Sequence, residues 1–356
     1  MLWDNVRKVS PYVPGEQPRE EGIIKLNTNE CPYPPSERVA WAIARFDAGS
    51  LRKYPDPDAS DLNRAIAGYL GVDEGMVFTG VGSDDVLAMS FITFFNSEKP
   101  VFFPDITYSF YPVWADLFNI KYETKPLRDG FSINPDDYRA ENGGVIFPNP
   151  NAPTSLAAPL PAVEEIIRAN RDVVVIVDEA YIDFGGESAL PLLKKYDNLL
   201  VVRTFSKSRA MAGMRIGFAV GNEKLISALK AVKFSFNSYT MSSVAIAAGI
   251  ASIEDEKHFM ETVEKIKGTR ERAKQELGLL GFSFPEPAAN FLFVKHESLD
   301  AAYIFKALKQ RGIYVRYFDG PLTADRLRIT VGTDAEMKAL CDALSEIVQS
   351  AGKMSK

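Results

Sequence analysis

Six short apolar segments, separated by stretches with helical spacing, most constrain how this 356-residue chain can fold. These segments lie at residues 76–79, 101–103, 145–147, 173–177, 199–202 and 216–220. Several are apolar at every position rather than at alternate positions, as is typical of strands covered on both faces. Strands that alternate with helices predict an α/β fold built on an open, mainly parallel sheet.

The pattern divides the chain into three parts. Residues 1–35 are rich in proline and lack periodicity, so we expect an arm that packs over something else. Residues 36–245 carry the alternating strands and helices of a large domain. Residues 246–356 hold a charged helical stretch, further strands and two more helices, which predicts a compact, smaller α+β domain at the C-terminus.

The charge balance and hydropathy argue against several classes of partner. Lys and Arg number 41 against 47 Asp and Glu, a net charge of −6, which gives no electrostatic reason to bind nucleic acid. We find no apolar run of about 18 residues that could span a membrane, and no N-terminal signal peptide. The sequence therefore predicts a soluble, cytoplasmic protein with no membrane partner.

Two scarce residue types exclude several kinds of catalysis. Two cysteines, Cys31 and Cys341, cannot form a disulfide framework or a four-thiolate metal site. The two histidines, His258 and His296, stand outside zinc-hydrolase and serine-hydrolase motifs. We therefore expect no metal site, and a proton carrier other than histidine.

Polar segments follow four of the predicted strands, at residues 80–85, 148–154, 178–181 and 203–208. Because ligands of open α/β sheets bind beyond the carboxyl ends of the strands, these segments predict one shared site. Asp178 follows five apolar residues directly, where a carboxylate is costly unless it is paired or coordinated.

A carboxylate at the position of Asp178 has three familiar roles. It resembles the magnesium-binding acid of P-loop nucleotide hydrolases, but no GxxxxGK[ST] loop is present. A dinucleotide site would use Gly80-Val81-Gly82 as its turn, but Asp85 stands where the third glycine belongs. The third role is that of an aspartate that only caps the next element.

Lys207 adds a fourth role for Asp178. It follows a neighbouring strand and is flanked by Ser206 and Ser208. A lysine at a strand end is usually solvated, but pyridoxal phosphate forms a Schiff base with a lysine while a carboxylate keeps its ring nitrogen protonated. The same cofactor would give Asp178 a buried cationic partner. Together, the two residues predict a pyridoxal phosphate site.

These residues resemble the signature of the fold type I, pyridoxal-phosphate-dependent aminotransferases. The signature here is Asn151, Asp178-Glu179-Ala180-Tyr181, Ser206-Lys207 and Arg215. More narrowly, segments of the chain resemble the histidinol-phosphate aminotransferase family, at residues 11–15, 54–56, 178–184, 203–207 and 327–330. The similarity extends from near residue 7 to near residue 349. It implies a large domain with a mainly parallel sheet flanked by helices, and a smaller α+β C-terminal domain.

The resemblance also implies the roles of the cofactor-site residues. Lys207 would form the Schiff base, Asp178 would bind the pyridine nitrogen, and Tyr108 would stack on the ring. Tyr181 and Asn151 would bind the phenolic oxygen. The phosphate would contact Gly82, Ser83, Asp84, Thr204, Ser206 and Arg215, the first three through backbone amides at a helix start.

The chain departs from the family pattern at Cys31, at Val81 and Asp85, and in one turn. The family's Asn-Pro-Thr-Gly appears here as Ala-Pro-Thr-Ser at residues 152–155, so the ring-facing asparagine is either Asn151 or Asn149.

By resemblance, Tyr54 reaches the phosphate of the neighbouring subunit in a homodimer. Its alternative role is that of an interface or core aromatic.

Substrate recognition is expected in the C-terminal domain. Arg328 alternates with apolar residues on the strand predicted over residues 327–331, and Arg316 alternates with Val315 on the strand predicted over residues 313–318. By spacing alone these are solvated arginines. By resemblance, Arg328 binds the phosphate or carboxylate of the substrate through two parallel hydrogen bonds, with Arg316, Asn290 and Tyr12 in support.

The resemblance implies amino transfer between small molecules, from L-histidinol phosphate to 2-oxoglutarate. Within the same class, an aromatic amino-acid aminotransferase and a threonine-phosphate decarboxylase have similar folds and motifs. From a different class, a regulator that binds pyridoxal phosphate without turnover is the alternative. A substrate panel separates the first three, and an absence of turnover identifies the last.

Overall fold

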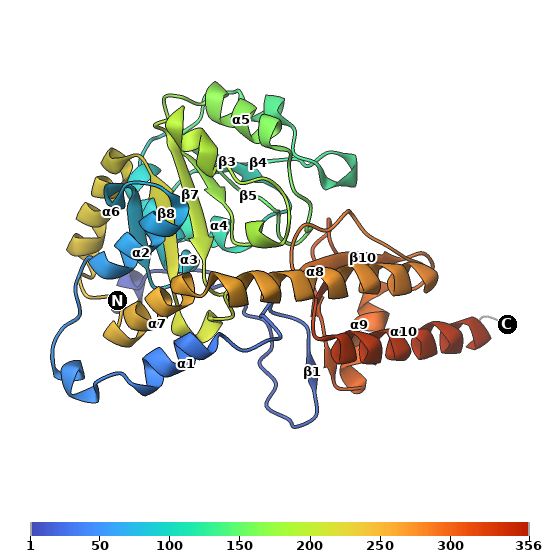
Figure 1. Ribbon diagram of the computed structural model, residues 1–356. Coiled ribbons are helices and arrows are strands. Elements are labelled where there is room, and N and C mark those ends of the chain that lie inside the picture. Colours follow the sequence, from blue (N-terminus) through green and yellow to red (C-terminus); the bar gives the residue numbers. More distant parts are fainter. Residues whose placement is uncertain (1, 355–356) are drawn as a thin grey trace.

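A seven-stranded sheet lies at the centre of the computed structural model, which describes residues 2–354 (Figure 1). Its strands are β2 (Val77–Gly80), β3 (Val101–Pro104), β4 (Tyr122–Lys125), β5 (Gly144–Pro148), β6 (Val175–Asp178), β7 (Leu199–Thr204) and β8 (Gly217–Gly221). Their order is β2-β8-β7-β6-β5-β3-β4. β8 runs antiparallel to both its neighbours, β2 and β7, and the other neighbouring strands of this sheet pair in parallel, so the predicted mainly parallel α/β fold is confirmed.

Most strands of this sheet contain continuous apolar runs because helices cover both of its faces. One face packs on α2 (Ser60–Leu70), α5 (Leu160–Ala169) and α7 (Ser243–Glu254). The other packs on α3 (Ser83–Phe94), α4 (Phe110–Phe118) and α6 (Glu223–Phe236). Within β6, Val175 and Val177 enter the first core and Ile176 enters the second. Each such buried side chain contributes roughly 1.5–3 kcal/mol.

A second, antiparallel sheet is built from the C-terminal part of the chain. Its order is β12 (Arg316–Tyr317), β13 (Leu327–Thr330), β10 (Phe291–His296) and β9 (Phe282–Ser283). It shares a third hydrophobic core with α8 (Glu256–Leu279), α9 (Ala301–Gln310) and α10 (Asp334–Met354). Figure 1 shows α8 extending from beside α7 to this smaller sheet, so one helix joins the two units.

The N-terminal segment is mostly irregular and packs against the smaller unit. Its strand β1 (Ile24–Lys25) pairs in parallel with β11 (Ile313–Tyr314), and α1 (Glu37–Ala44) follows. Our prediction of one strand over residues 313–318 was wrong, because the segment forms two short strands on either side of Val315. The first, β11, pairs with β1 of the arm, and the second, β12, pairs with β13. The predicted limits at residues 35 and 245 stay a prediction.

Two other features were not in the sequence analysis. The edge strand β4 was missed, because three of its four residues are exposed and it has no apolar run. Short 3₁₀ helices occupy Leu2–Asn5, Ala48–Arg52, Glu74–Met76, Asp129–Phe131, Pro135–Tyr138, Ile182–Phe184, Leu190–Lys194 and Ala212–Met214. Within residues 2–354, no helix has the length and apolar character needed to cross a membrane.

Candidate active site

The carboxyl ends of β5, β6 and β7 border a cavity of about 160 Å³. Asp178 ends β6 and Lys207 follows β7, so two adjacent parallel strands bring both residues into its wall. Eight of the twelve predicted cofactor residues line it, namely Ser83, Asp84, Tyr108, Asp178, Tyr181, Ser206, Lys207 and Arg215. The other four, Tyr54, Gly82, Asn151 and Thr204, lie outside this lining.

Asp178 is a buried carboxylate with two hydrogen-bond donors. The residue is 4% exposed, the Tyr111 hydroxyl donates to Oδ2 at 3.0 Å, and the Ala180 N–H donates to Oδ1 at 3.1 Å. Despite these bonds, burial raises the pKa of Asp178 to about 7. A cation placed against this carboxylate would therefore be strongly favoured, as the protonated ring nitrogen of pyridoxal phosphate requires.

Lys207 lines the same cavity beside the N-terminal arm. Its Nζ donates to the Thr28 carbonyl at 3.3 Å and lies 5.6 Å from the centroid of the Tyr181 ring. The Tyr181 hydroxyl accepts a hydrogen bond from the Asn29 side chain at 2.9 Å. Because Thr28 and Asn29 belong to the arm, the arm completes the cavity wall next to the lysine.

The start of α3 has the shape of an anion cradle. Gly82 precedes the helix with φ of +91°, and a Cβ there would collide with the Arg215 guanidinium. A Cβ at Gly217 would collide with the backbone of Gly82 and Ser83, so both glycines allow this close approach. The first N–H groups of a helix lack intrahelical acceptors and favour a phosphate group.

Polar side chains surround this helix start. Arg215 donates from Nη1 to Ser206 Oγ at 3.4 Å, and its Nη2 lies 3.4 Å from Asp84 Oδ2. The Tyr108 hydroxyl donates to Oδ1 of Asp84 at 2.8 Å. Thr204 donates to Ser206 at 3.0 Å and supports that serine from behind the lining. The charge and donor set therefore fit a phosphate.

The two candidate asparagines are engaged with the protein backbone. Asn151 donates to the Ile106 carbonyl at 2.9 Å and to Thr154 at 3.0 Å. Its Oδ1 is buried without a hydrogen-bond partner among residues 2–354. Asn149 exchanges hydrogen bonds with the backbone of Ala158 at 2.8 and 3.3 Å. The predicted contact of Asn151 or Asn149 with the cofactor ring stays a prediction.

Tyr54 lies on the surface, away from the cavity of its own chain. It is 81% exposed, and its ring stacks on Tyr239 with a centroid distance of 4.6 Å. The core-aromatic alternative therefore does not describe this residue. Its predicted reach into a neighbouring subunit stays a prediction.

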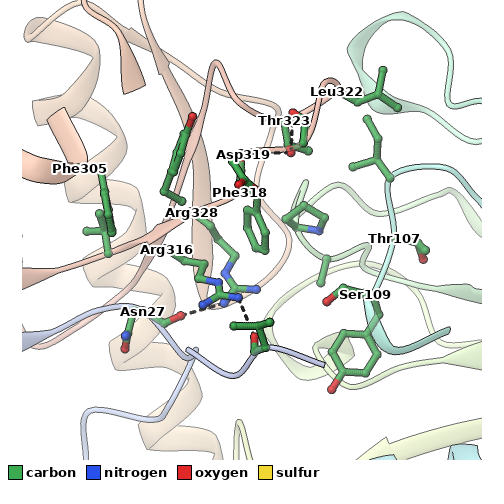
Figure 2. Close-up of a pocket in the computed structure, with 18 of the residues that line it drawn as sticks. Asn27, Thr107, Ser109, Phe305, Arg316, Phe318, Asp319, Leu322, Thr323 and Arg328 are labelled. Carbon is green, nitrogen blue, oxygen red and sulfur yellow. Dashed lines mark hydrogen bonds between the residues drawn. The ribbon is translucent and has the colours of Figure 1, made fainter. Parts of the chain in front are cut away.

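A larger cleft of about 790 Å³ adjoins the cavity, because Tyr108 and Ala152 line both. Arg316 and Arg328 are partners across β12 and β13, and Figure 2 shows both side chains directed into this cleft. Each guanidinium lies against the Phe318 ring, at 5.3 and 5.4 Å from its centroid.

The two arginines differ in how their donors are used. Arg328 donates from Nη2 to the Asn27 carbonyl at 2.9 Å, and its buried Nε has no hydrogen-bond partner within the described part of the chain. Arg316 donates to the carbonyls of Val13 and Pro14 at 3.1 and 3.3 Å. Burial, with Arg316 nearby, lowers the pKa of Arg328. An anion in the cleft would accept a hydrogen bond from Nε of Arg328 and would offset the positive charges of the two neighbouring arginines.

The two supporting candidates have different positions. Tyr12 lines the cleft and stacks on Phe110 with a centroid distance of 4.1 Å. Asn290 is fully buried, lines neither the cavity nor the cleft, and donates to the Asn29 carbonyl at 3.1 Å. It therefore supports the arm residue that binds Tyr181.

Three residues that shape the site were not predicted from the sequence. Tyr111 binds Asp178, Asn29 binds Tyr181, and Gly217 allows the close approach of the phosphate cradle. Tyr108 precedes α4 and Tyr111 lies in its first turn, so helical spacing does not link the two residues. Local sequence gave no signal for Tyr111 or for Gly217.

Known proteins resemble this chain over nearly its whole length. The model of the family "Aminotransferase class I and II" matches residues 21–344. Histidinol-phosphate aminotransferase 2 of Dechloromonas aromatica is 54% identical, covering 97% of this chain and 99% of the relative. Histidinol-phosphate aminotransferase 1 of Hydrogenovibrio crunogenus is 52% identical, covering 97% of each.

Solved structures agree with this result. Histidinol-phosphate aminotransferase from Sinorhizobium meliloti, in complex with pyridoxal-5′-phosphate, superposes with a TM-score of 0.84 at 27% identity. The match covers 92% of this chain and 91% of that one. The histidinol-phosphate aminotransferase from Clostridium acetobutylicum has a TM-score of 0.85 at 22% identity over 92% of this chain and 100% of that one, which supports the fold.

Proposed function

We propose a specific reaction from an established premise: the chain belongs to the aminotransferase class I and II family. It is a pyridoxal-5′-phosphate-dependent transaminase. The proposed reaction transfers the amino group of L-histidinol phosphate to 2-oxoglutarate, giving imidazole-acetol phosphate and L-glutamate in histidine biosynthesis. The observation that carries it is the Asp178–Lys207 cavity opening beside a cleft that two arginines enter.

The residues of the cavity fit the cofactor in charge and in shape. We propose that Asp178 holds the ring nitrogen and that the start of α3, with Ser206 and Arg215, holds the phosphate. The raised pKa of Asp178 supports the first assignment, and the glycine cradle at Gly82 supports the second. Pyridoxal phosphate, when bound, supplies an electron sink that weakens the Cα–H bond of the substrate.

Three further residues would orient the ring. Tyr108, which borders both the cavity and the cleft, is proposed to lie against the ring face. Tyr181, held by Asn29, is proposed to bind the phenolic oxygen together with Asn151. Fixing the ring in this way would keep the breaking Cα–H bond aligned with the electron sink.

Lys207 has two proposed roles. Its Nζ would bind the cofactor covalently and, once displaced by the substrate amine, would take the proton from the substrate Cα. The position of Nζ, 3.3 Å from the Thr28 carbonyl, supports the second role, because this neutral acceptor orients the amine without an ion pair.

We expect replacement of Arg328 with lysine to lower kcat/KM for histidinol phosphate by roughly 10- to 100-fold, mainly through KM. A lysine keeps the positive charge but cannot form two parallel hydrogen bonds with a phosphate. Steady-state kinetics on the purified variant measure the effect. Arg326→Lys is the matched control, because Arg326 lies two residues away but does not line the cleft. Equal losses in both variants would contradict the assignment.

A substrate panel tests the proposed function. Purified protein is mixed with histidinol phosphate, phenylalanine, tyrosine or threonine phosphate, each with 2-oxoglutarate, and glutamate formation is followed. We expect histidinol phosphate to give the highest kcat/KM, because its phosphate can engage both arginines. Preference for an aromatic amino acid, release of carbon dioxide from threonine phosphate, or cofactor binding without any turnover would each refute the proposal.

We also propose that the chain works as a homodimer in which Tyr54 reaches the phosphate site of the neighbouring subunit. Its exposure supports a second copy as the partner, as does the exposure of Tyr239, which stacks on it, and of Phe236, three residues before Tyr239. Mixing an inactive Lys207→Ala subunit with an inactive Tyr54→Ala subunit should restore activity, since hybrids regain one intact site. Failure of the mixture, or a monomer in sedimentation, would count against this arrangement.

A cytoplasmic location is part of the same proposal. A phosphate ester carries charge that keeps it from crossing a membrane unaided, so the enzyme that consumes one works in the compartment where it is made. Fractionation of cells followed by immunodetection tests this, and recovery outside the cytoplasm would contradict it.

A further inference from the structure

Tyr111, on α4, is the side chain that holds the cofactor-facing aspartate. It is completely buried, and its hydroxyl lies 3.0 Å from Oδ2 of Asp178. Edge-on contacts with Phe103 and Tyr108, at centroid distances of 5.9 and 5.8 Å, hold its ring. The hydroxyl therefore has a fixed direction toward the carboxylate.

We propose that Tyr111 is the positioning residue that keeps Asp178 ionised and oriented toward the cavity, an inference that rests on the proposed function. Tyr111 does not line the cavity, so it acts only through Asp178. Its hydroxyl binds one carboxylate oxygen while the Ala180 N–H binds the other. Two donors on opposite oxygens fix the carboxylate plane.

Tyr111 can act only as the donor in this pair. Burial, and then the charge of Asp178, raise its pKa well above the usual value, so the phenol keeps its proton. A hydrogen bond given to the charged form of a carboxyl group favours that form. Tyr111 thus opposes the effect of desolvation, which favours the protonated, uncharged form of Asp178.

The other charged groups near Asp178 do not replace this contribution. Asp84 on α3 and the adjacent Glu179 both disfavour its charge, and they add to the effect of burial. Arg203 pairs with Glu179 at 2.8 Å and offsets only that neighbour. The cations of the cavity wall, Lys207 and Arg215, are those proposed to bind the cofactor itself.

The test compares Tyr111→Phe with Tyr138→Phe as holoenzymes. Tyr138 is an equally buried tyrosine in another core, and its hydroxyl has no hydrogen-bond partner among residues 2–354. Both variants lose one buried hydroxyl, but only the first removes a bond to a charge. We expect Tyr111→Phe to weaken pyridoxal phosphate binding by about 10- to 100-fold, whereas Tyr138→Phe leaves it unchanged.

A pH profile separates this role from a merely structural one. Without the Tyr111 donor, Asp178 protonates more readily, so the pH at which cofactor affinity and kcat fall on acidification should move upward. The shift should be absent in Tyr138→Phe. Adding Tyr111→Phe to Asp178→Asn should change affinity far less than adding it to the wild type, because the asparagine carries no charge. Tyr111→Met, which also lacks a donor, is the second variant if Tyr111→Phe does not fold.

The outcomes are distinguishable. A wild type that binds no pyridoxal phosphate would overturn the proposed function and this inference with it. A wild type that binds and turns over, with Tyr111→Phe matching Tyr138→Phe in affinity and pH profile, would overturn the inference alone. An equal effect of Tyr111→Phe in the wild-type and Asp178→Asn backgrounds would also overturn it.

Discussion

Replacing Lys207 with alanine is expected to abolish transamination, lowering kcat by roughly 10⁴-fold or more. The substitution removes both the covalent attachment of the cofactor and the amine proposed to take the Cα proton. The visible absorbance of the lysine-bound cofactor should disappear at the same time. Initial rates with histidinol phosphate and an absorbance spectrum measure both effects.

Lys207→Arg is the matched variant for this experiment. It keeps the positive charge of the cavity wall but provides no nucleophilic amine. We expect it to be as inactive as Lys207→Ala while retaining more of the cofactor affinity. Borohydride reduction of the wild type, followed by peptide mass analysis, should place the cofactor on Lys207. Turnover by either variant, or reductive labelling at another lysine, would remove this residue from the mechanism.

The sheet was predictable because a strand that is buried on both faces has apolar residues at successive positions of its sequence. Residues 173–177 are apolar throughout because neighbouring side chains of β6 face opposite cores, and the structure places β6 at Val175–Asp178. The edge strand β4 has no such constraint, since most of it faces solvent. The strand predicted over 313–318 divides because its halves pair with different partners, information that local sequence does not hold.

The site was predictable where chemistry alone restricts the residue type. A carboxylate after a buried strand and a lysine after its neighbour have few common uses, and the structure brings Asp178 and Lys207 into one cavity. The residues that hold Tyr181 and Asp178 in place were not predictable. Asn29 meets Tyr181 across 152 positions of sequence and Tyr111 meets Asp178 across 67, so only folding reveals these contacts. A tyrosine hydroxyl or an asparagine amide has many ordinary uses in a protein, which is why neither residue was marked.

Replacing Asp178 with asparagine is expected to lower kcat by roughly 10³-fold while making the cofactor-free protein more stable at neutral pH. Asparagine has nearly the same shape but cannot keep a ring nitrogen protonated. The gain in stability arises because a buried carboxylate that resists ionisation is costly when it must ionise. Loss of activity with a gain in the free energy of unfolding cannot result from misfolding, so the two measurements together identify an electrostatic role.

The pH dependence of this stability has a definite sign. The pKa of Asp178 is raised from 3.8 to about 7 in the folded protein, so folding is favoured while the group is protonated. That stability is fully present below pH 3.8 and is lost as the pH rises through about 7. The stability difference between Asp178→Asn and the wild type should therefore grow across this window, as denaturant unfolding at several pH values would measure.

Glu179→Gln is the matched control. Burial raises the pKa of Glu179 as well, but here a cation of the protein, Arg203, opposes that effect, so we expect the opposite change in stability. Glu179 is equally buried, but it is paired with Arg203 at 2.8 Å and accepts hydrogen bonds from Ser188 and from the Ala189 N–H. Removing its charge leaves Arg203 with only the longer ion pair to Asp183, at 3.9 Å, so the control should be destabilised. If Asp178→Asn is destabilised as well, or if it keeps near-normal turnover, the carboxylate of Asp178 does not have the role assigned to it. The two variants would thus distinguish two adjacent buried carboxylates by their cationic partners. Glu179 pairs with an arginine of the protein, and Asp178 is proposed to pair with the cation of a bound ring.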